Sequence, residues 1–162
     1  MVNFREKMLS FRHLCYKNGY LFAAFLIPVI LMGIAYISFG IYPFGGRSVL
    51  SLDLNAQYVF YFDYVHDVIG NGESLMYSWS RNLSGEFMGI IGYYLASPFN
   101  ILVWIFPRSM ITEGLLTMML AKFGACGVTF ALFAHKSQKL SKTTAVLFAP
   151  MYALCAYMLS LI

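Results

Sequence analysis

The sequence predicts an all-α integral membrane protein: a fragment of a polytopic helical bundle whose long extracytoplasmic first loop contains interfacial helices. Three observations lead to this prediction. Residues 18–46 contain no charged side chain. The composition is 60% hydrophobic, 18% aromatic and 11% charged, whereas soluble domains carry about 25% charged residues. The Lys and Arg residues cluster beside apolar stretches, and such clusters orient a protein in a membrane.

The first membrane helix is expected at residues 19–42. Its apolar stretch, residues 19–41, is longer than the about 20 residues that a helix needs to cross a hydrocarbon core of about 30 Å. The tail before it, residues 1–18, carries four basic residues (Arg5, Lys7, Arg12 and Lys17) against one acid. A basic flank of this kind belongs in the cytoplasm. No signal-peptide cleavage site is evident, so this helix is expected to stay uncleaved.

Two more membrane helices are expected at residues 111–134 and 143–162, the last of them truncated. The loop between them, residues 135–142, is short and basic and is therefore expected in the cytoplasm. Since the N-terminus is cytoplasmic too, residues 43–110 form an extracytoplasmic loop. The chain is expected to be a multi-pass protein.

Residues 87–107 are also apolar, but we interpret them as an interfacial or re-entrant segment. A full crossing here would move the basic loop to the outside. Pro98 removes a backbone donor and disfavours a helix at the residue before it. Tyr93, Tyr94 and Trp104 suit the membrane interface. The alternative is a kinked helix that spans the membrane.

The outer loop also contains an amphipathic helix, expected at residues 51–69. Ser51 or Asp53 can cap its start, and the glycines just after it can end it. Four polar or aromatic residues recur at spacings of three and four and share one face: Asp53, Gln57, Tyr61 and Tyr64. An apolar stripe runs through Val59, Phe62, Val65 and Ile69.

Asp53 is the candidate for chemistry, because it would lie at the outer interface just beyond the first membrane helix. One interpretation is a solvated helix cap without a further role. The other is a general base that faces a membrane-side cleft and takes a proton from an acceptor hydroxyl. Asp63 and Asp67, four residues apart on another face, are interpreted as solvated charges.

Two cations are candidates for binding. An unpaired Lys at the centre of a membrane helix costs about 2.5–3.5 kcal/mol, so Lys122 either pairs with a carboxylate or faces a polar cavity and binds a lipid phosphate. Arg81, in a segment expected to be a loop at residues 77–85, either binds phosphate or pairs with Glu86. The basic residues form no stripe, so no nucleic-acid binding is predicted. The His and Cys residues lack metal-ligand spacing, so no metal ligand is predicted.

Four segments, in this order, resemble the N-terminal part of the YfhO family of bacterial membrane proteins: YPFGGRSVLSLDLNAQY, YSWSRNLSGEF, YYLASPFN with IFP, and LAKFGACGVTF. The resemblance extends over most of residues 42–133. Members of that family are longer than this chain, in line with the expected fragment.

The family is similar to the C-type membrane glycosyltransferases, which transfer a sugar from a polyprenyl-phosphate donor on the outer face of the membrane. The resemblance implies that Asp53 is the catalytic base of an inverting transfer and that the acceptor is a teichoic acid, in particular lipoteichoic acid. Gln57, Tyr58, Arg81 and Lys122 are the substrate-binding candidates. The implied location is the bacterial plasma membrane. Some related enzymes carry paired acids in this loop, whereas Asp53 is followed by Leu54, so a divalent metal is neither predicted nor excluded. No other cofactor is predicted.

By itself the chain is expected to be inactive. The competing interpretation is a non-enzymatic membrane protein, either a transporter whose Lys122 lines a solute path or a scaffold of an envelope complex. A transporter would gather its polar residues around a cavity at the membrane midplane.

Overall fold

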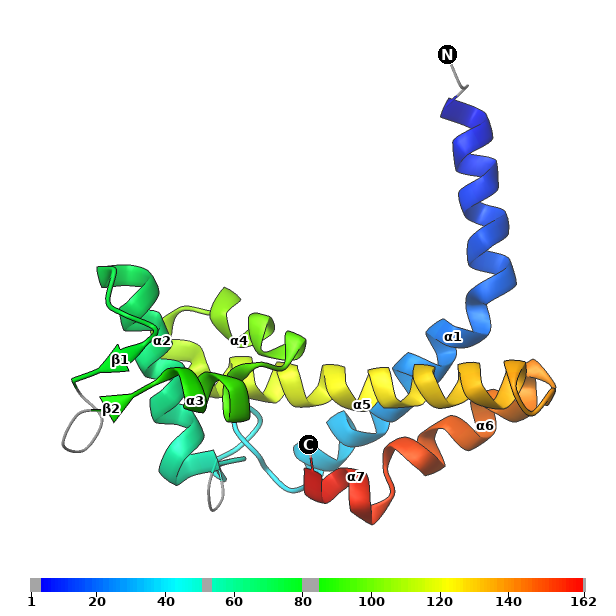
Figure 1. Cartoon of the computed structure of the whole chain (residues 1–162). Coiled ribbons are helices and arrows are strands. Elements are labelled where there is room, and N and C mark those ends of the chain that lie inside the picture. Colours follow the sequence, from blue (N-terminus) through cyan, green and yellow to red (C-terminus); the bar gives the residue numbers. More distant parts are fainter. Residues whose placement is uncertain (1–3, 51–53, 80–84, 162) are drawn as a thin grey trace. The chain divides into compact units, whose positions relative to one another are not determined.

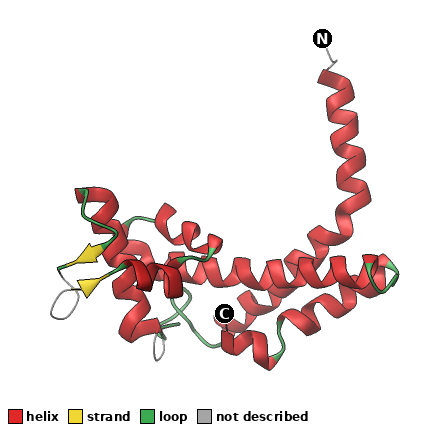
Figure 2. Cartoon of the chain, in the orientation of Figure 1, coloured by secondary structure: helices red, strands yellow, loops and turns green. Residues whose placement is uncertain are grey.

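The described part of the chain folds into helices joined by turns, with one small pair of strands (Figure 2). The computed structural model describes residues 4–50, 54–79 and 85–161. The elements in chain order are α1 (Phe4–Ser38), the π-helical turn η1 (Leu54–Tyr58), α2 (Val59–Asn71), β1 (Tyr77–Ser78), β2 (Gly85–Glu86), α3 (Met88–Ile90), the π-helical turn η2 (Ile91–Leu95), the 3₁₀ turn η3 (Pro98–Asn100), α4 (Ile101–Ile105), the 3₁₀ turn η4 (Arg108–Met110), α5 (Ile111–Lys136), α6 (Lys142–Ala153) and α7 (Ala156–Leu161) (Figure 1).

These elements form two compact units. The first unit comprises Met1–Ile34 and Leu120–Ile162, and the second comprises Ala35–Met119. Each unit has its own cluster of buried apolar side chains.

Among the described residues, two helical stretches are long and apolar enough to cross a membrane: Asn18–Ser38 and Arg108–Lys136. They overlap the helices expected at residues 19–42 and 111–134. Together with the predominance of helix, they confirm the all-α membrane class. The extracytoplasmic position of the chain between them stays a prediction.

The end of α1 is set by a glycine. Gly40 adopts the left-handed conformation (φ 61°), which costs a residue without a Cβ little. The turn lets the N–H of Ile41 donate to the carbonyl of Tyr36 at 2.9 Å, so a carbonyl of the last helical turn gains a partner. The helix therefore ends at Ser38, a few residues before the expected boundary at residue 42.

The first unit is packed through small residues. Its buried cluster consists of five alanines (Ala24, Ala131, Ala134, Ala145 and Ala149). In α5, a methyl group added at Gly127 would come within 3.0 Å of Pro28 in α1. Small residues let helix backbones approach closely, which is how membrane helices associate.

The second unit has a core of larger side chains. Helix α2 supplies Phe62, Val65 and Val68, whereas Ile69 of the expected apolar stripe is exposed. The partners of α2 in this core come from the residue before α3, from three short elements (α3, η2 and α4) and from the start of α5: Phe87, Ile90, Leu95, Val103, Ile111, Leu115 and Met118. At its C-terminal end α2 stops at Asn71 with Gly72 left-handed (φ 70°), as expected from the glycines there.

Two apolar stretches are broken in the structure. Within residues 87–107, the arm Met88–Leu95 and the arm Pro98–Ile105 are bent by 94°, at the position where Pro98 disfavours helix. This bend agrees with either a re-entrant segment or a broken span, so the interfacial interpretation stays a prediction. The stretch 143–162 forms two helices, α6 and α7, instead of one. Pro150 cannot donate a backbone hydrogen bond, and α6 ends one turn after it.

Residues 77–85 were expected to form a loop, and this prediction is wrong at both ends of the segment, which lie in β-strands. Tyr77 pairs with Glu86 and Ser78 with Gly85 in antiparallel register. The pairing is continued by the N–H of Phe87, which donates to the carbonyl of Met76 at 2.9 Å. Two residues per strand are too few to show the alternating pattern that predicts a strand.

Candidate functional site

The candidate site in the second unit begins at the π-helical turn η1. Gln57 and Tyr58 both lie in this turn and are half-buried. π-Helical turns are rare and occur frequently at functional sites. Asp53 immediately precedes the turn in sequence but lies outside the described residues, as do Ser51 and Arg81.

Because a π-helical turn bonds residue i to residue i+5, spacings of four do not complete a turn here. Asp53 lies outside the described residues, so the face expected to join it to Gln57 and Tyr61 stays a prediction. From Val59 onward the helix is regular, and Tyr61 and Tyr64 do share a neighbour, Phe87.

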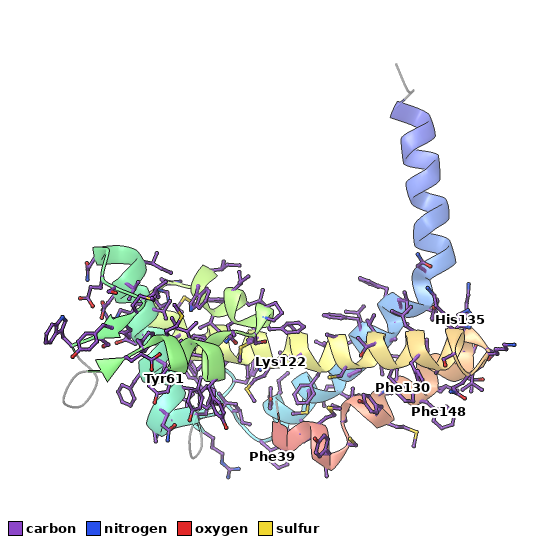
Figure 3. The ribbon with its side chains drawn as sticks, viewed as in Figure 1. Phe39, Tyr61, Lys122, Phe130, His135 and Phe148 are labelled. Atoms are coloured by element: carbon purple, nitrogen blue, oxygen red, sulfur yellow. The ribbon has the colours of Figure 1, made fainter. Side chains whose placement is uncertain are left out.

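A cluster of aromatic rings connects η1 and α2 with the second π-helical turn, η2. Tyr58 contacts Tyr94 of η2 edge to face, with ring centroids 4.9 Å apart, and Tyr61 contacts the same ring at 5.3 Å. Tyr64 packs on Phe87 at 4.5 Å. Figure 3 labels Tyr61 among the side chains of this unit. Aromatic pairs of this geometry contribute about 0.5–1.5 kcal/mol beyond the burial of their area.

An ion-pair network links α2 to η4 through two acidic residues of the helix. Arg108, in η4, donates to both oxygens of Asp63 and, through Nη1 at 2.5 Å, to Asp67. The Asp63 and Asp67 side chains are 33% and 30% exposed. The interpretation of these two residues as solvated charges was therefore wrong: they clamp α2 to the start of α5.

Tyr64 holds the strand pair against α2. Its hydroxyl lies 3.0 Å from the carbonyl oxygen of Ser74 and 3.3 Å from that of Tyr77, and it can donate to either. Ser78, next in β1, is buried. The segment between α2 and β1 is thus positioned by a residue of the helix.

A hydrogen bond also links the segment after α1 to the start of α5. The hydroxyl of Tyr42 donates to Oε1 of Glu113, in the first turn of α5, at 2.8 Å. Accepting this bond and carrying a negative charge, Glu113 raises the pKa of Tyr42 above its ordinary value of 10.0.

Lys122 lies within the apolar helix α5, four residues before Cys126 (Figure 3). It is half-buried, and no ion pair involves it among the described residues. Lys122 belongs to the first unit, whereas Gln57 and Tyr58 belong to the second. Of the candidate site residues that the structure describes, Gln57 and Tyr58 are neighbours in η1, and the substrate-binding role of all the candidates stays a prediction.

The described residues contain no group of three or more His, Cys, Asp or Glu side chains placed to hold a metal ion. What the second unit offers instead is carboxylates, hydroxyls and aromatic rings. These groups can bind uncharged polar molecules by hydrogen bonds and stacking.

Comparison with known protein families matches residues 23–162 to the family described as bacterial membrane protein YfhO. The chain belongs to the YfhO family. This finding confirms the resemblance noted in its sequence segments. Comparisons with curated proteins and with solved structures gave no significant match.

Several positioning residues of this YfhO chain were not found from its sequence. Arg108 is separated from Asp63 by 45 residues and from Asp67 by 41. The two acids at i and i+4 were a usable signal for a shared cation, because side chains at this spacing lie on one face of a helix. Tyr94 was assigned to the membrane interface only, and its contact with Tyr58 had no signal in the sequence.

Proposed function

We propose that this YfhO chain serves a membrane glycosyltransferase that transfers a sugar from a polyprenyl-phosphate donor to a teichoic acid, in particular lipoteichoic acid, on the outer face of the bacterial plasma membrane. The observation that carries the proposal is a contact between two π-helical turns. One of them, η1, directly follows Asp53 in the chain, and its Tyr58 contacts Tyr94 of the other, η2. The similarity of the YfhO family to the C-type membrane glycosyltransferases supplies the reaction class.

In the proposed reaction Asp53 is the general base. Its carboxylate accepts the proton of the acceptor hydroxyl while the hydroxyl oxygen attacks the anomeric carbon of the donor sugar. The bond between that carbon and the phosphate oxygen breaks, the configuration inverts, and polyprenyl phosphate leaves. One glycosidic bond replaces one glycosyl phosphate bond, so no redox partner is needed.

The other candidates have binding roles. Gln57 and Tyr58 can form hydrogen bonds to sugar hydroxyls, since an amide and a phenol both donate and accept. Negative charge develops on the departing phosphate and requires cationic donors. Arg81 and Lys122 are the proposed donors, and the absence of an ion pair to Lys122 among the described residues supports this assignment.

The test is Asp53→Asn, introduced into the gene that encodes the chain, with the sugar content of the envelope polymer as the readout. A general base contributes about 10²–10⁴-fold to rate, so glycosylation should fall by at least about 100-fold at normal protein levels. Asp53→Glu keeps a carboxylate and should retain part of the activity. Unchanged glycosylation in the Asn variant would remove Asp53 from the mechanism.

A transporter remains a second candidate function, and Lys122 is the observation that favours it. A charged residue within a membrane helix is a default marker of a substrate or ion path. Lys122→Met should then abolish solute uptake, whereas in a glycosyltransferase it should weaken donor binding and leave the uptake of solutes unchanged.

A further inference from the structure

A pocket that the proposed reaction does not use lies beside α2, β1 and the segment between them. It has a volume of about 350 Å³ and is lined by Tyr64, Glu73, Ser74, Tyr77 and Trp79. All five residues belong to the second unit. The lining combines one carboxylate, three hydroxyl groups and an indole, a mixture of polar groups and flat apolar faces that suits a small polar molecule.

Trp79 is unusually exposed for its type, because 81% of its surface is accessible. An indole ring in the core would stabilise the fold by removing a large apolar area from water. The exposed ring of Trp79 contributes little of this stabilisation. It is nevertheless held in place: its ring meets that of Tyr77 edge to face, with centroids 5.0 Å apart. The backbone of Tyr77 is in turn fixed by pairing with Glu86 and by Tyr64. The indole is thus a positioned flat surface that the described residues leave uncovered.

The polar groups around this surface specify the charge of the ligand. Glu73 brings a carboxylate, which repels phosphate and other anions and accepts hydrogen bonds from hydroxyls. The Oγ atom of Ser74 accepts from the N–H of Met76 at 3.1 Å, so its proton is available to a ligand. Among the lining residues that the structure describes, none is Lys or Arg.

A pyranose ring matches these features. One of its faces carries axial C–H bonds and stacks on an indole, because the positive edge of C–H dipoles is attracted by the negative face of the ring. Its rim carries hydroxyls, which donate to a carboxylate. We propose that this pocket is a subsite for an uncharged pyranose ring, stacked on Trp79 and bound through its hydroxyls by Glu73. The proposal rests on the proposed function for the source of the ring, which is either the donor sugar or sugar already attached to the polymer.

The two tryptophans of the chain allow a direct binding test. Trp104→Phe leaves Trp79 as the single indole. In the full chain in detergent, titration with methyl glucopyranoside should give a saturable change of Trp79 emission. Glu73→Gln in the same background should weaken binding by about tenfold, since it removes a hydrogen bond to a charged group. Tyr93→Ala is the matched control, because Tyr93 is equally exposed (81%) and does not line the pocket; it should bind as before.

The absence of a saturable response, or an equal response in the Glu73→Gln variant, would overturn the proposal. The proposal would also be overturned if Trp79 inserts into the membrane instead of binding sugar. In vesicles of brominated phosphatidylglycerol, the lipid would then quench the emission of Trp79, and added methyl glucopyranoside would not change that emission. Titration with a short polyprenyl-phosphate sugar and with glycosylated polymer fragments distinguishes the two sources, and binding of either supports the subsite. The same titration in the Asp53→Asn chain separates the two proposals, because sugar binding at Trp79 does not require transfer.

Discussion

Tyr58 and Tyr94 meet edge to face, with their ring planes at 89° and their centroids 4.9 Å apart. Each ring belongs to a π-helical turn, Tyr58 to η1 and Tyr94 to η2. The contact joins the start of the helical segment that follows Asp53 to the first arm of the bent segment 87–107. In the proposed enzyme, this contact would set the direction in which the chain enters η1.

Tyr94→Ala should destabilise the second unit, because the ring of Tyr94 also contacts Tyr61 and Tyr93. We expect a loss of about 1–3 kcal/mol in the free energy of unfolding, measured by chemical denaturation in detergent. Tyr94→Phe keeps the ring and should stay close to the original stability. Equal losses in both variants would assign the effect to the hydroxyl and contradict the account.

Arg108 should be coupled to Asp63. The guanidinium of Arg108 bonds both Asp63 and Asp67, and a Lys cannot reproduce this geometry. The Arg108 side chain is 54% exposed, so solvent weakens the pair, and a double-mutant cycle with Arg108→Gln and Asp63→Asn should give a coupling of about 0.5–1 kcal/mol. Arg108→Lys should recover only part of it. Additive effects of the two substitutions would show that the network contributes nothing to stability.

Gly127→Ala should loosen the packing of α5 on α1 in the first unit. The added methyl would meet the carbonyl of Ala24 and approach Pro28 to 3.0 Å, and overpacking of this kind costs about 1–3 kcal/mol. Gly33→Ala is the control, because a methyl at this helical glycine meets nothing within 4 Å. The midpoint of thermal unfolding should fall for Gly127→Ala and stay level or rise for Gly33→Ala. A fall of equal size in both would attribute the effect to loss of glycine itself.

The Tyr42–Glu113 hydrogen bond predicts a loss of stability in alkali. Because the pKa of Tyr42 is raised, the folded chain holds this proton more tightly than the unfolded chain. The contribution is complete below the ordinary pKa of 10.0 and is lost as the pH rises through the raised value. Tyr42→Phe should therefore show a smaller decrease of stability above pH 10 than the original chain. If the stability of both chains decreases equally above pH 10, the hydrogen bond to Glu113 does not hold the proton of Tyr42, and the prediction is contradicted.

The sequence predicted those parts of the fold that depend on local composition. The two candidate spans follow from long apolar runs, and the end of α2 follows from Gly72. The break near Pro98 was predicted from the missing backbone donor. The π-helical turns and the strand pair were not predicted. Apolar periodicity does not distinguish a π-helical turn from an α-helical one, and two residues per strand are too few to show an alternating pattern.

The candidate site was predicted less completely than the fold. Gln57 was singled out by the face it was expected to share with Asp53, and both Gln57 and Tyr58 by lying in a segment that resembles the YfhO family. Both lie in η1, and their role in binding stays a prediction. The Arg108 network was missed because Arg108 is more than 40 residues distant from its partners, and no pattern along the chain joins them. Trp79 lies in the segment 77–85 that was expected to be a loop, but it was given no role of its own, and Glu73 was not singled out.

The central claim is that the chain from η1 to α2 faces the outside of the cell, and labelling with a membrane-impermeant maleimide tests it most directly. After replacement of the three native cysteines by serine, single cysteines are placed at the exposed positions Asn55, Asn71 and Gln138. In intact cells the account predicts labelling at 55 and 71, and labelling at 138 only after permeabilisation. Labelling at 138 in intact cells, with 55 and 71 protected, would contradict it.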